Sequence, residues 1–92
     1  MTATTMTHDA RIVMQALQEL LKRDYARTVS APDLLTQSGL ETEPLKTAVV
    51  ELATGPRPYL AARFAESGEG GEATLVEIRL TTAGQQFCRV RD

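Results

Sequence analysis

The first clear pattern in the chain is a run of apolar residues spaced three or four positions apart between residues 9 and 25. This spacing places apolar side chains on one face of an α-helix and polar side chains on the other. The apolar positions are Ile12, Val13, Ala16, Leu17, Leu20 and Leu21. Asp9 near the start and Lys22 near the end suit the helix dipole. The pattern predicts an amphipathic helix near residues 9–25.

A short helix is predicted over residues 31–38, because the residues at both of its ends have the character of helix caps. Ser30 can accept a hydrogen bond at the start, and Pro32 and Asp33 suit the first turn. Gly39 can adopt the left-handed conformation that commonly ends a helix. We therefore expect the chain to turn tightly after this helix.

A third helix is predicted over residues 43–54. Thr42 is expected to cap it, and Gly55 with Pro56 to end it. Its apolar stripe consists of Leu45, Ala48, Val49 and Leu52. The opposite side of this helix is left for solvent or for a partner.

After residue 55 the apolar period changes from that of a helix to that of a strand. Alternating residues predict strands near residues 59–65 and 74–80, joined by a mobile, Gly-rich tip at residues 66–73. The side chains expected to face the core are Leu60, Ala62, Phe64, Val76, Ile78 and Leu80. Arg63 and Glu77 would then share the outer face, where opposite charges attract.

Two further elements complete the prediction. Residues 28–29 can form a short extended piece before the second helix. A final helix is predicted near residues 82–90, with a threonine as its cap and with Phe87 and Val90 turned inward. The fold class expected from these elements is α+β, mainly α.

This order of elements resembles the winged helix-turn-helix family of bacterial transcriptional regulators. Residues 29–52 look like a helix-turn-helix with Gly39 at the turn, and Leu80-Thr-Thr-Ala-Gly84 looks like the family's Leu-Thr-x-x-Gly element. That element ends the second wing strand and starts the final helix in the family. The resemblance extends over about residues 9–90. It implies a three-helix bundle with a two- or three-stranded wing hairpin and a short C-terminal helix.

In the family, the helix after the turn lies in the DNA major groove and the hairpin tip contacts the backbone or the minor groove. Carried over by position, the DNA-reading helix is residues 43–54 and the wing is residues 66–73. Thr47 can hydrogen-bond a base edge, and Val50 can contact a thymine methyl group. The candidate DNA contacts are Glu43, Lys46, Thr47, Val50, Thr54, Arg57 and Arg63.

The resemblance implies a DNA-binding transcriptional regulator that acts as a dimer on double-stranded DNA. Dimerisation is expected because two DNA-reading helices spaced by one turn of DNA gain an affinity that neither has alone. Candidate contacts between the two copies are Leu20, Leu21, Phe87 and Val90.

The distribution of charge supports a second hypothesis. The chain has 10 basic and 12 acidic residues, and residues 30–54 carry one basic and four acidic side chains. Glu66, Glu69 and Glu72 lie in the predicted wing, where a cation would contact phosphate. The alternative function is therefore a winged-helix protein–protein interaction module that does not bind DNA and meets a basic protein partner.

The composition is typical of a globular protein, with 42% hydrophobic and 24% charged residues among 92. This length suffices for one domain. Residues 1–7 show no apolar period and no charge, so we expect a disordered N-terminal tail at residues 1–7 and a single winged-helix domain at residues 8–92.

Candidate chemistry is sparse. Cys88 and His8 are the single residues of their types and lie far apart in sequence, so neither a zinc site nor a Cys–His nucleophile pair is expected. Cys88 is expected to be a small buried apolar side chain. We expect no enzyme, no metal and no cofactor. No apolar run approaches the ~18 residues of a membrane span and no secretory leader is evident, so a cytoplasmic protein is expected.

Overall fold

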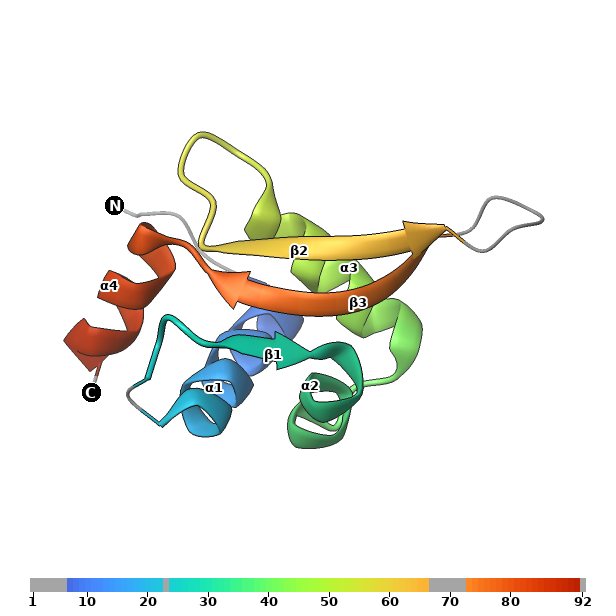
Figure 1. The fold of residues 1–92 in the computed structure, drawn as a ribbon, viewed down its shortest axis with the longest axis horizontal. Coiled ribbons are helices and arrows are strands. Elements are labelled where there is room, and N and C mark those ends of the chain that lie inside the picture. The colour runs from blue at the N-terminus through green and yellow to red at the C-terminus, as the bar shows by residue number, and fades with distance from the viewer. Residues whose placement is uncertain (1–6, 23, 67–72, 92) are drawn as a thin grey trace.

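The computed structural model describes residues 7–22, 24–66 and 73–91. These residues form four helices and a three-stranded antiparallel sheet, so the protein is α+β and mainly helical (Figure 1). The elements in chain order are α1 (His8–Leu21), β1 (Thr28–Ser30), α2 (Ala31–Ser38), α3 (Thr42–Ala53), β2 (Leu60–Glu66), β3 (Ala73–Leu80) and α4 (Thr82–Arg91).

The first helix begins as predicted but ends four residues early. Thr7 is its N-cap and accepts a hydrogen bond from the Ala10 N–H at 3.2 Å. Lys22 adopts a left-handed conformation with φ of 49°, so the predicted end at residue 25 is wrong. Tyr25 is buried, but it reaches the core from the turn after the helix.

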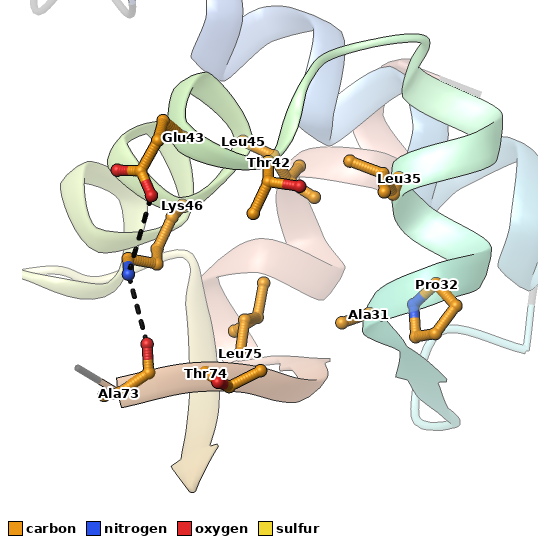
Figure 2. Close-up of a pocket in the computed structure, with 10 residues that line it drawn as sticks. All are labelled: Ala31, Pro32, Leu35, Thr42, Glu43, Leu45, Lys46, Ala73, Thr74 and Leu75. Carbon is orange, nitrogen blue, oxygen red and sulfur yellow. Dashed lines mark hydrogen bonds and ion pairs between the residues drawn. The ribbon is translucent and has the colours of Figure 1, made fainter. Parts of the chain in front are cut away.

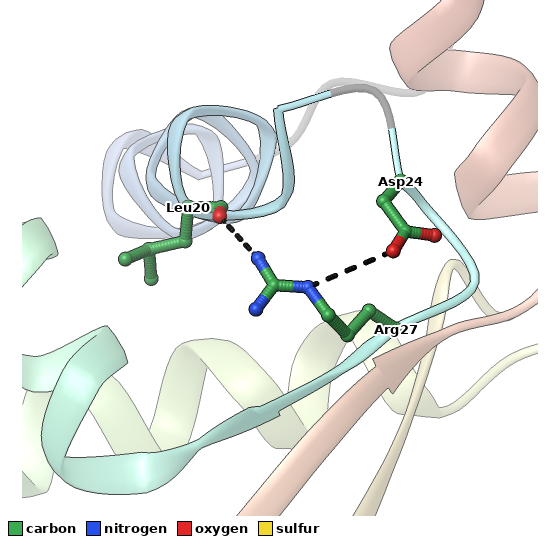
Figure 3. A network of polar contacts seen from close by, with 3 residues as sticks. All are labelled: Leu20, Asp24 and Arg27. Atoms are coloured by element: carbon green, nitrogen blue, oxygen red, sulfur yellow. Dashed lines mark hydrogen bonds and ion pairs between the residues drawn. The ribbon is translucent and has the colours of Figure 1, made fainter.

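The turn after α1 is held by a polar contact between neighbouring segments (Figure 3). The Arg27 guanidinium donates to the Leu20 carbonyl at 2.7 Å and lies 3.9 Å from the Asp24 carboxylate. The carbonyl groups of the last helical turn have no hydrogen-bond partner within the helix. The Arg27 guanidinium is the donor for one of these carbonyls, that of Leu20. The chain is thereby directed from α1 into β1.

The caps of α2 confirm the sequence prediction. The Ser30 hydroxyl accepts from the Asp33 N–H at 3.4 Å, and Gly39 is left-handed with φ of 74°. For α3, however, the N-cap is Glu41, which makes no side-chain capping hydrogen bond. Thr42 is already helical, because the Leu45 N–H donates to the Glu41 carbonyl at 3.0 Å. The prediction of Thr42 as the cap is therefore wrong by one position.

The sheet has the order β1-β3-β2, with β3 in the centre. Arg63 pairs with Glu77, whereas the next residue, Phe64, pairs with Leu75, so Val76 is an extra residue at a β-bulge. Of Leu75 and Val76, it is Leu75 that packs against the core. The prediction that Val76 faces inward is wrong, because an extra residue reverses the alternation of faces.

The core is formed by α1, α2, α3 and one face of the sheet, and its largest fully buried side chains include Leu17, Leu34, Leu60 and Ile78. All four residues of the predicted apolar stripe of α3 are buried. Cys88 on α4 is also buried, as predicted. Val90 on the same helix is 85% exposed, so the prediction that it turns inward is wrong.

Candidate nucleic-acid interface

The third helix buries one side and presents the other to solvent. Glu43, Thr47, Val50 and Thr54 are all exposed, with Val50 at 45%. We call these four residues the α3 arc. The 100° turn per residue placed them on one side of the helix, and their exposure agrees with that expectation. The arc carries one carboxylate, two hydroxyls and one apolar side chain, and no cation.

Lys46 is the only basic residue of α3, and its side chain reaches from α3 to the start of β3, beside Glu43 (Figure 2). Its side chain is 25% exposed, and its Nζ donates to the Ala73 carbonyl at 3.1 Å. The Glu43 carboxylate lies 4.0 Å from the same Nζ. The Lys46 ammonium therefore lies beside Glu43 at the edge of the α3 arc, between α3 and the start of β3.

Two polar side chains at the C-terminal half of α3, Glu51 and Thr54, form hydrogen bonds within the protein. The Thr54 hydroxyl donates to the Val50 carbonyl at 3.0 Å. The Glu51 carboxylate accepts from the Thr7 N–H at 3.3 Å and from its hydroxyl at 3.0 Å. These bonds tie residue 7, which the sequence analysis assigned to the tail, to the third helix. Residues 1–6 lie outside the described residues.

The two arginines among the candidate contacts lie in different surroundings. Arg63 is exposed on β2, and its Nε lies 3.1 Å from a carboxylate oxygen of Glu77 across the sheet, as the predicted register implied. Arg57 is exposed in the segment between α3 and β2. It follows the C-terminal end of α3, whereas Lys46 and Ala73 mark the opposite end of that helix. A rise of ~1.5 Å per residue separates the two ends of α3 by about 16 Å.

The hairpin of β2 and β3 extends beyond the helices, close to the N-terminal end of α3 (Figure 1). Glu66 is the last residue of β2 and is exposed. Glu69 and Glu72, which the sequence analysis placed in the wing, lie outside the described residues. The structure thus brings Glu43, Lys46 and the base of the hairpin together and leaves Arg57 apart from them.

Sequence reasoning missed one feature at this end of the molecule. A cavity of about 270 Å³ lies between α2, α3 and β3, and Lys46 lines it (Figure 2). The cavity depends on how three separate elements pack. A lysine on the boundary of the apolar stripe is the only signal that the sequence offers for it.

The described part of the chain lacks two other kinds of feature. No group of three or more His, Cys, Asp or Glu side chains there is arranged to hold a metal ion. No helix among those residues is long and apolar enough to cross a membrane. Comparison of the chain with protein-family models, with curated proteins and with solved structures gives no match.

Proposed function

We propose that this protein is a winged helix-turn-helix regulator that binds double-stranded DNA. In this proposal α3 is the DNA-reading helix and the hairpin of β2 and β3 is the wing. The observation that carries the proposal is the exposed α3 arc, on a helix that follows the left-handed turn at Gly39 and precedes a projecting antiparallel hairpin. An exposed helix of this kind has the dimensions to enter a major groove.

In the proposed complex, Thr47 and Val50 near the middle of α3 face the base edges. A threonine hydroxyl hydrogen-bonds a base, and an exposed valine contacts a thymine methyl group. Arg63 and Arg57 are the candidates for phosphate contacts, because each is an exposed cation on a neighbouring segment. The Lys46 ammonium already lies between the Ala73 carbonyl and the Glu43 carboxylate, so we expect its contribution to be smaller than that of Arg57.

The test measures binding to mixed-sequence duplex DNA by fluorescence anisotropy between about 50 and 200 mM salt. Each contact with a phosphate releases about one counterion, so the DNA affinity falls steeply with salt over this range. Arg57→Ala and Arg63→Ala are each expected to lower the salt slope by about one, and Thr47→Ala to relax preference at one base pair. Arg11→Ala removes an exposed cation from α1 and serves as the control. Absence of any DNA binding by the native protein at ~50 mM salt would overturn the proposal, since screening is weak there.

A second candidate function is a protein–protein interaction module with a basic partner. The specific observation in its favour is that the α3 arc has a carboxylate and no cation, with Glu41 and Asp33 also exposed nearby in the chain. If this function holds, the native protein binds no DNA in low salt. Glu43→Lys and Val50→Asp would instead abolish binding of the protein partner. The first reverses a charge on the contact surface, and the second places a carboxylate at its apolar position.

Both candidate functions are binding functions, and neither includes catalysis or a cofactor. A cytoplasmic location belongs to the same proposal, since a regulator of transcription works where DNA is accessible. We further propose that the protein acts as a homodimer. Two DNA-reading helices in one particle bind the same DNA together, so the DNA affinity of the dimer exceeds that of a single chain.

A further inference from the structure

The cavity between α2, α3 and β3 has an apolar interior and one charged corner (Figure 2). Its apolar lining comes from Ala31, Pro32, Leu35, Leu45 and Leu75. These residues belong to three elements that are distant in sequence and meet only in the fold. Lys46 forms the charged corner, with Glu43 at the outer edge. The cavity thus offers an apolar surface and an ammonium group to the same occupant.

The Lys46 ammonium is only partly satisfied by the described residues. It has three N–H donors, of which one is used by the Ala73 carbonyl at 3.1 Å. The Glu43 carboxylate, at 4.0 Å, is beyond hydrogen-bond distance and is 75% exposed. The Lys46 side chain is 25% exposed, so its aliphatic stem is largely covered and the ammonium can accept a closer carboxylate as a charge-assisted hydrogen-bond partner.

The volume limits the size of the occupant. A cavity of about 270 Å³ is slightly smaller than typical pockets for drug-sized ligands and larger than the ~150 Å³ that holds a benzene ring. One aromatic ring with a short acidic arm therefore fits it.

We propose that this cavity binds a small apolar monocarboxylate, with its ring among the leucines and its carboxylate on the Lys46 Nζ. The carboxylate replaces the distant Glu43 as the partner of the ammonium, and Glu43 turns further into solvent, where it is already largely exposed. The Thr42 hydroxyl at the rim offers a second donor. Binding requires no DNA, so this inference stands apart from the proposed function.

The test is a titration of the isotope-labelled full chain with phenylacetate at pH 7, followed by two-dimensional NMR. We expect saturable shifts at the residues that line the cavity, with a dissociation constant of about 1 mM or below. Phenylacetamide, which has the same shape without the charge, is expected to bind about tenfold more weakly. Acetate, which has the charge without the ring, is expected to give no saturable shift.

Two variants test the role of the ammonium. Lys46→Met keeps the apolar stem and is expected to weaken phenylacetate binding about tenfold while leaving phenylacetamide binding unchanged. Arg11→Met removes an exposed cation outside the cavity and is expected to change neither affinity. The native chain with the two ring compounds still decides the question if Lys46→Met does not fold.

Three results would overturn the inference. They are shifts located away from the cavity, equal affinity for phenylacetate and phenylacetamide, and no saturation with phenylacetate up to about 10 mM. Loss of DNA binding in the separate anisotropy experiment has no bearing on this outcome, because the NMR titration contains no DNA.

Discussion

At the scale of single residues, Thr81 and Gly84 explain why the Leu-Thr-x-x-Gly element is needed in this fold. The Thr81 hydroxyl accepts from the Gly84 N–H at 3.2 Å and donates to the Pro58 carbonyl at 2.6 Å. The Thr81 N–H donates to the Tyr59 carbonyl at 3.1 Å. A Cβ atom at Gly84 would overlap that same carbonyl oxygen and would lie 2.9 Å from Leu80. The element therefore fixes α4 against the segment that leads into β2.

Replacement of Gly84 by alanine is the sharpest test of this contact. Gly84→Ala is expected to lower the free energy of unfolding by about 2–3 kcal/mol, because the Tyr59 backbone has to move to admit a methyl group. Urea denaturation followed by circular dichroism measures the change. Gln86→Ala, at an exposed position of the same helix, is the control and should stay within about 0.5 kcal/mol of the native protein. Equal losses at the two positions would contradict the close approach.

At the scale of elements, the sequence predicts the type of each element more reliably than the direction of its side chains. The four buried residues of α3 follow from periodicity alone, since they share one side of the helix. The direction of the Lys46 side chain does not follow from periodicity, because its hydrogen-bond partner Ala73 lies 27 residues later and on another element. The exposed arc was therefore predictable, whereas the cavity beside it was not.

The β-bulge shows a second limit of the same kind. Alternation along β3 predicts that Val76 faces the core, and the extra residue at the bulge gives that place to Leu75. A bulge depends on pairing with the partner strand, which a single strand's pattern does not contain. Leu75 and Val76, for which the alternation predicts the wrong side of the sheet, are suitable for a direct comparison.

Leu75→Ala is expected to destabilise the protein by about 1–2 kcal/mol, less than a fully buried leucine because Leu75 is half-buried. Val76→Ala is expected to cost less than about 1 kcal/mol, since its side chain does not pack against the core. Urea midpoints of the two variants, measured under identical conditions, give the order. A larger loss for Val76→Ala would place the bulge elsewhere in β3.

At the scale of the whole molecule, the helix α4 lies at one end, where Gln18 of α1 donates to the Cys88 carbonyl at 3.4 Å. The molecule extends 42 × 29 × 22 Å, and α4 lies at the end of the sheet opposite the projecting hairpin (Figure 1). Phe87 packs onto Tyr59 with ring centroids 5.3 Å apart, whereas Val90 is 85% exposed one turn later. Of the predicted dimer contacts, Leu21 is withdrawn because it is 1% exposed and belongs to the core of the single chain. Leu20, Phe87 and Val90 remain candidates.

The described chain has two exposed large apolar residues, Val50 on α3 and Val90 on α4, and they allow a matched test of the dimer. The native protein is expected to sediment as a particle of twice the 10.0 kDa chain mass at micromolar concentration. Val90→Asp is expected to give the single chain, because a carboxylate at an apolar contact loses water without gaining a partner. Val50→Asp adds the same charge on α3 and is expected to leave the dimer intact.

The opposite result would change the proposed function as well as the dimer contact. If Val50→Asp separates the copies and Val90→Asp does not, the α3 arc is covered by a second copy and is not available to a major groove. The interaction module would then be favoured over the DNA-binding regulator. If instead Val90 holds the dimer, both α3 arcs stay exposed, and DNA binding should become tighter with dimer formation because two contacts are linked. Comparing the DNA affinity of Val90→Asp with that of the native protein completes the test, with a loss of at least about tenfold expected.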